Sequence, residues 1–233
     1  MTDDLKPQRQ GTCGLYSFWY ATQLLAELGG TKGIVYPREC EGSTGGWESS
    51  RHYAKRRVNS GQGEVMSERE MVTIVKHYGY KPHCYGSFFT DKRKAFITKH
   101  LNANQPILIP YLMDKNPEAV TKRAVYGVGG SQAGCGAHWS LIIAEQGDQY
   151  GYLEPNDPLT ITWWNKDLLL ASNACVDKVK YVQYWRKPGP KRLAPLGDFW
   201  FQCNAKKAAG GDSLYDVGSK SRQSLDKVLI AVS

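Results

Sequence analysis

The densest hydrophobic segment of the chain spans residues 13–27, where apolar side chains cover nearly every face of a helix. Leu15 and Trp19 follow one helical stripe, while Phe18 and Leu24 extend the apolar surface around the axis. A helix with this pattern is buried on all sides. Two glycines at 29–30 are typical of the end of such a helix. We therefore expect this helix to lie in the core.

Polar residues mark the starts of two further helices. Ser67, followed by Glu70 three residues later, forms a capping box, which predicts a helix that continues to about residue 77. Thr90 or Asp91 is expected to cap another helix, which continues to about residue 101. All three predicted helices precede the part of the chain that favours strands.

The pattern changes from helical to strand-like after residue 105. Apolar and β-branched residues fill 106–111, which predicts a buried strand. Periodicity disappears from 112 to 137, where five glycines indicate a mobile loop. Residues 138–144 and 150–154 predict a β-hairpin around a turn at 146–149, and two later strands are expected at 178–185 and 226–232.

Helices followed by antiparallel strands are typical of the α+β class. A chain of 233 residues can form one domain around a single core. We therefore expect residues 1–233 to form one domain, with an N-terminal helical part packed on an antiparallel β-sheet. Residues 187–224 are rich in Pro, Gly, Lys and Ser, and we expect an irregular excursion there, anchored by the aromatic residues at 199–201.

Composition excludes several classes of protein. No apolar run approaches the ~18 residues of a membrane span. The first five residues are acidic and lack the apolar core of a secretory signal, so no such signal is expected. These features favour a cytoplasmic protein, or one delivered to a host cytosol if it is a secreted effector.

Basic residues exceed acidic ones, 30 to 22, which gives a net charge of +8. The excess is concentrated at 51–57, 92–94 and 187–192. Such clusters indicate either a solvated basic surface or an acidic partner, which is nucleic acid or an acidic protein segment. No stacking motif or zinc-finger spacing accompanies the charge, so a nucleic-acid partner is disfavoured.

The six cysteines are scattered and form no CxxC pair, which argues against a structural zinc site. Without a signal peptide they are also a poor disulfide scaffold, so reduced thiols are expected. We expect neither a metal nor a cofactor. Each cysteine is therefore judged by its surroundings.

Cys13 has the surroundings of a reactive thiol, because it lies at the start of the predicted buried helix. Unpaired N–H groups and the positive end of the helix dipole stabilise a thiolate there. Gly11 and Gly14 permit a substrate to approach the backbone closely. The N–H of Cys13 and a nearby glutamine amide, from Gln8 or Gln10, can supply an oxyanion hole. The alternative is a small cysteine that only packs the helix end.

His138 is the candidate base for this thiol. It opens a strand after the glycine-rich loop, and the returning strand brings Glu154 back beside it. A catalytic imidazole needs a third group to orient it. Glu154 fits the hairpin length best, and Asn156 and Asp157 are alternative orienting residues.

A cysteine at a helix start, a histidine on a distant strand and an orienting residue on the next strand resemble the papain-like cysteine peptidases. Papain's own Gln-Gly-x-Cys-Gly-x-Cys motif does not fit, since it would place Tyr16 at the nucleophile. The Cys-Gly pair is closer to the bacteriocin-processing branch, and within it the chain resembles the actin maturation protease family. The segments that carry this resemblance are 8–15, 63–67 with Met71, 104–111, 137–139 and 164–173, and little of it extends beyond 186.

The resemblance implies a papain-like fold and an aminopeptidase-like enzyme that trims the N-terminus of actin. It implies Cys13 as nucleophile, His138 as general base and an upstream glutamine as oxyanion donor. Gln8, five residues before the cysteine, suits that role better than Gln10, three residues before. The acidic N-terminus of actin is compatible with the net charge of +8.

Two other functions remain open at the level of sequence. The same cysteine–histidine pair performs deamidation or acyl transfer in bacterial effectors. A non-enzymatic basic module that binds protein or nucleic acid, with a structural Cys13, is the second alternative. We expect a protein or peptide substrate and no membrane partner.

Overall fold

In the computed structural model the described residues are 5–8, 12–29, 33, 37, 49–57, 65, 67–87, 89–113, 136–174, 176, 182–186, 199–203, 213–216, 225 and 227–233. The elements, in chain order, are α1 (Cys13–Glu27), α2 (Ser50–Arg57), α3 (Glu68–His77), β1 (Pro82–Gly86), α4 (Thr90–Asn102), β2 (Ile107–Met113), β3 (Gly136–Gln146), β4 (Gln149–Glu154), β5 (Asp157–Asn165), α6 (Lys166–Asn173), β6 (Val182–Arg186), β7 (Phe199–Cys203), β8 (Ser213–Asp216) and β9 (Val228–Val232).

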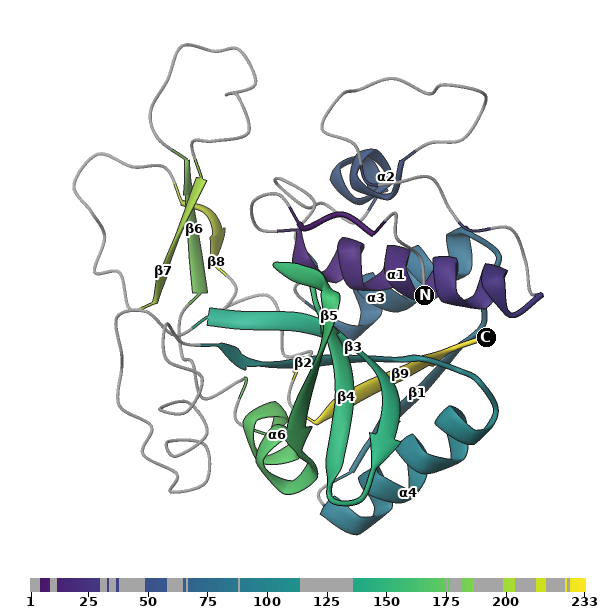
Figure 1. The fold of residues 1–233 in the computed structure, drawn as a ribbon. Helices are drawn as coiled ribbons and strands as arrows, with labels where there is room; N and C mark the ends of the chain where they lie inside the picture. Colours follow the sequence, from purple (N-terminus) through teal and green to yellow (C-terminus); the bar gives the residue numbers. More distant parts are fainter. Residues whose placement is uncertain are drawn as a thin grey trace.

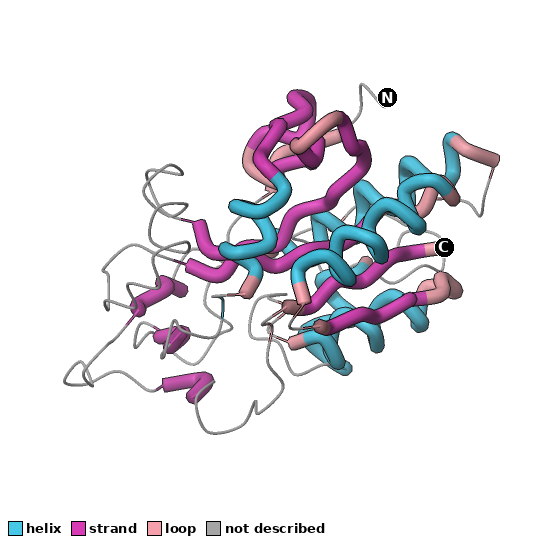
Figure 2. The backbone as a smooth tube through the Cα atoms, turned by 90° about the horizontal axis from the view of Figure 1, so that it is seen from below, coloured by secondary structure: helices cyan, strands magenta, loops and turns pink. Residues whose placement is uncertain are grey.

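A six-stranded antiparallel sheet in the order β1-β9-β2-β3-β4-β5 organises the described part of the chain. Helices cover both faces of this sheet: α1 and α3 lie on one side, and α4 and α6 lie on the other (Figure 1). The view from below shows the helices on either side of the strands (Figure 2). The α+β class predicted from the sequence is confirmed.

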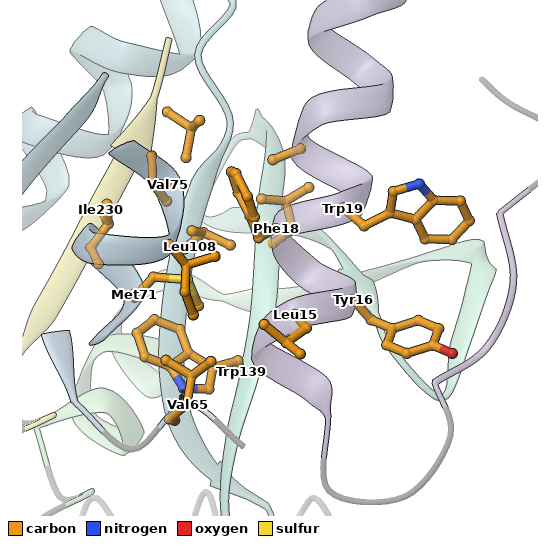
Figure 3. Close-up of a cluster of buried hydrophobic side chains, with 14 of the residues drawn as sticks. Leu15, Tyr16, Phe18, Trp19, Val65, Met71, Val75, Leu108, Trp139 and Ile230 are labelled. Atoms are coloured by element: carbon orange, nitrogen blue, oxygen red, sulfur yellow. Dashed lines mark hydrogen bonds between the residues drawn. The ribbon is translucent and has the colours of Figure 1, made fainter. Parts of the chain in front are cut away.

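The core on the α1 side contains large side chains from elements far apart in the chain. Leu15 and Phe18 of α1 pack with Met71 of α3, Leu108 of β2 and Trp139 of β3 (Figure 3). All five side chains are buried. Burial of a side chain of this size contributes about 1.5–3 kcal/mol, so this layer fixes the start of α1 against the sheet.

The opposite face has its own core because side chains alternate along each strand. Ile107, Ile109 and Tyr111 of β2 point to this face, where they meet Ile97 of α4 and Leu169 of α6. Residue His138 of β3 is the direct register partner of Tyr111, so the two side chains share this face. One end of this second core therefore lies next to the candidate site.

Several predicted elements are confirmed. Helix α1 has the predicted bounds, and the Ser67 hydroxyl caps α3 by accepting a hydrogen bond of 3.2 Å from the Glu70 N–H. The hairpin of β3 and β4 is present, with its turn at Gly147 and Asp148. Strand β6 overlaps the predicted range 178–185 and ends one residue later, and β9 lies within the predicted range 226–232. Residues 178–181 and 226 are outside the described residues.

Other predictions are wrong. Phe89, not Thr90 or Asp91, is the N-cap residue of α4, and no side chain caps this helix. The predicted loop 112–137 is strand at both ends, because β2 continues to Met113 and β3 begins at Gly136. The remainder of that loop is outside the described residues.

The basic cluster at 51–57 is not simply a solvated surface. It forms most of α2, and the Arg51 side chain is only 2% exposed. Residues 187–224 are not wholly irregular either, since β7 and β8 pair with β6 in a separate three-stranded sheet. Phe199, Trp200 and Phe201 belong to β7. Across the described ranges no helix combines the length and hydrophobicity needed to cross a bilayer.

Candidate active site

The start of α1 presents its backbone N–H groups without a competing cap. Thr12 is the N-cap residue, but its side chain makes no capping hydrogen bond, and the first turn contains no acidic residue. The first N–H groups of a helix lack partners within the helix and carry its positive end. The half-buried Cys13 is the first residue of the helix, so its thiol lies where a negative charge is stabilised.

Gly14 allows this thiol to lie against β3. A Cβ atom at Gly14 would lie 3.0 Å from Val65 Cβ and 3.1 Å from Trp139 Cδ1. Trp139 is itself held, because its indole N–H donates to the Val65 carbonyl at 2.8 Å. The backbone N–H of Trp139 donates to Cys13 Sγ at 3.4 Å. The Cys-Gly pair is thus packed against the residue that follows His138.

His138 lies beside Cys13, and its side chain is almost fully buried. The imidazole Nε2 is 2.5 Å from Glu154 Oε1. Burial by itself lowers the pKa of His138, but the charge of Cys13, the hydrogen bond with it and the carboxylate of Glu154 together raise that pKa to about 10. Because Glu154 occupies Nε2, Nδ1 is the ring nitrogen left to face the sulfur. The surroundings of His138 therefore favour the protonated imidazolium form of this side chain beside Cys13.

Glu154 is held by hydrogen bonds at both carboxylate oxygens. Oε1 faces His138 and also accepts from the side-chain amide of Asn156 at 3.0 Å. Oε2 accepts from the Tyr111 hydroxyl at 2.5 Å. Burial raises the pKa of Glu154, but the bonds from His138, Tyr111 and Asn156 more than offset it and lower the pKa below the ordinary value. The carboxylate is therefore ionised at neutral pH.

Asn156 connects this carboxylate to Gln8. An ionised carboxylate only accepts hydrogen bonds, so Asn156 turns its Nδ2 toward Glu154 and its Oδ1 toward the other side. That Oδ1 accepts from Gln8 Nε2 at 2.9 Å. The Gln8 backbone N–H also donates to the Pro155 carbonyl at 2.6 Å. The segment before α1 is thus joined directly to the turn after β4.

The candidates from the sequence are not all brought together. Cys13, His138 and Glu154 are adjacent, Asn156 is hydrogen-bonded to the carboxylate, and Gln8 is hydrogen-bonded to Asn156. Asp157 lies exposed at the start of β5. Gln10 is outside the described residues.

Sequence reasoning missed Tyr111 and Trp139 as members of the site. Both lie in short blocks that carry the family resemblance, the Ile-Pro-Tyr and Ala-His-Trp segments. Their roles depend on the register of β2 against β3, in which Tyr111 pairs with His138 and Pro110 with Trp139. A pairing between strands distant along the chain leaves no local sequence pattern, so only the resemblance pointed to these residues.

The arrangement is suited to nucleophilic acid–base chemistry. It combines a thiol at a helix start, a buried imidazole and a carboxylate that orients the imidazole, which is the constellation of a catalytic triad. Among the described residues, no three histidine, cysteine, aspartate or glutamate side chains are grouped as metal ligands.

Comparison with known proteins identifies a matching family. The profile of the family described as actin maturation protease-like, C-terminal domain, matches residues 5–145, which is more than half of the chain. No curated protein and no solved structure matches. The matched range includes Cys13, Tyr111 and His138, whereas Glu154 and Asn156 lie beyond its end. The chain therefore belongs to the actin maturation protease-like family.

Proposed function

We propose that the protein is a cysteine peptidase with a papain-like arrangement, in which Cys13 is the nucleophile and His138 the acid–base residue. One observation carries the proposal. The Cys13 thiol, at the uncapped start of α1, is adjacent to the buried imidazole of His138, and Glu154 binds Nε2 of this imidazole. Membership of a protease-like family supports the same reading.

The first half of the reaction is acylation. The Cys13 thiolate attacks the carbonyl carbon of the scissile peptide bond, a C–S bond forms, and the carbonyl electrons move to oxygen. In this proposal the oxyanion accepts hydrogen bonds from the Cys13 N–H and from the second hydrogen of Gln8 Nε2, the first being donated to Asn156. The C–N bond then breaks, and His138 transfers its proton to the departing amine.

The second half is deacylation. Neutral His138 takes a proton from water, and the hydroxide attacks the thioester carbon. The C–S bond breaks, the acid is released and the thiolate re-forms beside the imidazolium. Glu154 remains ionised throughout and holds the ring in the orientation that both proton transfers need.

The proposed substrate is an acidic protein N-terminus, that of actin being the candidate implied by the family. The net charge of +8 favours a negatively charged partner, since opposite charges increase association rates and local concentration. Removal of an N-terminal residue by this chain would make it aminopeptidase-like. A cytoplasmic location is part of the same proposal.

The first prediction concerns Cys13→Ala. We expect this variant to lose hydrolysis of a peptide that copies an acidic actin N-terminus by at least about 10³-fold, since the nucleophile is absent. Cys84→Ala is the matched control, because partial burial and Glu68 raise the pKa of Cys84 to about 12 and keep that thiol protonated. The control is expected to retain full activity.

Mass spectrometry of the products separates the outcomes. Peptide cleavage gives two fragments whose summed mass exceeds that of the substrate by one water. A mass increase of about one unit without cleavage would instead show deamidation. Hydrolysis that persists in Cys13→Ala contradicts the proposal. A second peptide, in which the acidic residues are replaced by their amides, tests the substrate class and is expected to be cleaved more slowly.

A further inference from the structure

Tyr111 is a buried residue that lies against the candidate triad without being one of its three members. It is the register partner of His138 across β2 and β3, and its side chain is 3% exposed. The two rings meet edge to face, with centroids 5.6 Å apart and planes at 85°. Trp164 and Tyr152 also contact the Tyr111 ring edge to face. These contacts fix the direction of its hydroxyl.

That hydroxyl is committed to Glu154. It donates to Oε2 at 2.5 Å, the oxygen that does not face His138. Burial and the nearby Glu154 charge hold the pKa of Tyr111 well above its ordinary value, so the phenol stays protonated. A phenol has one proton to donate, and Tyr111 donates it to the Glu154 carboxylate.

A glutamate has a particular need for such a donor. Its side chain has three rotatable bonds, so a carboxylate bound at one oxygen can still turn about its long stem. Asn156 binds the same oxygen as His138 and therefore does not fix the second one. The donor on Oε2 in the described part of the chain is Tyr111.

We propose that Tyr111 is a positioning residue of the site: its hydroxyl fixes Glu154 in the one orientation that holds the His138 imidazolium toward Cys13. Tyr111 touches neither substrate nor the reacting atoms in this role. The inference rests on the proposed peptidase function for its kinetic consequences, but not for its effect on the thiol. The assignment extends the triad to a chain that runs from Tyr111 through Glu154 and His138 to Cys13.

The second prediction is that Tyr111→Phe lowers kcat by about tenfold while KM changes little, because a charge-assisted hydrogen bond is lost without loss of a substrate contact. The pH profile of kcat/KM is expected to narrow from both sides. Loss of the Tyr111 donor raises the pKa of Glu154, which moves the acid limb of the profile to higher pH. A displaced carboxylate lowers the pKa of His138, which moves the basic limb to lower pH.

Tyr150→Phe is the matched control. It also removes one buried tyrosine hydroxyl from the same face of the sheet, but the Tyr150 hydroxyl has no hydrogen-bond partner among the described residues. We expect this variant to keep the wild-type kcat and pH profile. Thermal unfolding of both variants checks that each is folded. An effect of Tyr111→Phe that Tyr150→Phe reproduces would overturn the inference, since it would reflect packing alone.

Alkylation of Cys13 by iodoacetamide, followed by peptide mass spectrometry, separates failure of this inference from failure of the proposed function. Tyr111→Phe is expected to slow alkylation at about pH 6 by about tenfold, because a less firmly held imidazolium stabilises the thiolate less. In a Glu154→Gln background the Tyr111→Phe change is expected to have no further effect. An unchanged alkylation rate, or equal effects in both backgrounds, overturns the inference whether or not peptides are cleaved.

Discussion

Gly14, which follows Cys13, packs closely against Val65 and Trp139, with little room for a larger side chain. The nearest atoms are within 3.0–3.1 Å of the position that a Cβ would occupy. Alanine is favoured over glycine in a helix by about 1 kcal/mol. A glycine at this helical position is therefore explained by contact with β3 and not by helix formation.

The third prediction follows from this contact. Gly14→Ala is expected to lower the free energy of unfolding by about 1–3 kcal/mol, because overpacking costs more than the gain in helix propensity. Ser17→Ala is the control in the same helix. In the part of the chain that the structure describes, the Ser17 hydroxyl is buried without a hydrogen-bond partner, so its removal is expected to be neutral or stabilising. Urea denaturation measures both. A Gly14→Ala variant as stable as wild type would contradict the prediction, since it would show that Val65 and Trp139 move to accommodate the added methyl group.

At the scale of elements, Asn173 at the end of α6 bridges the neighbouring strands β2 and β9 beyond the last residues that pair between them. Its side-chain amide donates to the Pro110 carbonyl of β2 at 2.7 Å and to the Val228 carbonyl of β9 at 3.2 Å. Its Oδ1 accepts from the buried Arg93 of α4 at 3.0 Å. Pro110 has no N–H to contribute to the sheet. Asn173 therefore ties two helices and two strands together beside Tyr111.

The fourth prediction is that Asn173→Ala lowers the free energy of unfolding by about 2–4 kcal/mol, because it leaves two carbonyls and a buried guanidinium short of partners. Asn165→Ala is the comparison, since Asn165 caps the other end of the same helix and lies closer to solvent. Loss of an N-cap costs about 1 kcal/mol. Chemical denaturation that finds equal losses in the two variants would contradict the role of Asn173 as a tie between elements.

Elements with a strong local pattern could be predicted, and elements defined by long-range pairing could not. Helix α1 and the β3–β4 hairpin have dense apolar segments and a short turn. Strand β5 was not predicted, because it is the sheet edge and residues on both of its faces are partly exposed, which removes the expected alternation. Strand β1 is also an edge strand, and no element is predicted at its residues from the sequence.

The candidate site follows the same division. The proximity of Glu154 to His138 could be predicted, because a hairpin of known length returns the chain to its start. The hydrogen bond from Gln8 to Asn156 depends on how the segment before α1 packs on the turn after β4. Neither segment has a sequence pattern that predicts this contact. The burial of Arg51 could not be predicted for the same reason, because a cluster of basic residues does not indicate which of its side chains is buried in the fold.

At the scale of the whole molecule, the site exists because two halves of the chain meet. The N-terminal half supplies Cys13 from the start of α1, and the sheet supplies His138 and Glu154 from adjacent strands. The hydrogen bond from the Trp139 N–H to Cys13 Sγ and the hydrogen bond from Gln8 to Asn156 join the two halves of the chain. The account therefore depends on an electrostatic pairing between the thiol and the imidazole.

The titration of His138, followed by NMR of its ring nitrogens, tests that pairing most directly. The charge of Cys13 and the hydrogen bond with it raise the pKa of His138, so Cys13→Ala is expected to move the loss of the imidazolium to lower pH. Cys84→Ala should leave the titration unchanged. A His138 that titrates at the same pH in wild type and Cys13→Ala would contradict the account, since the two groups would then not interact.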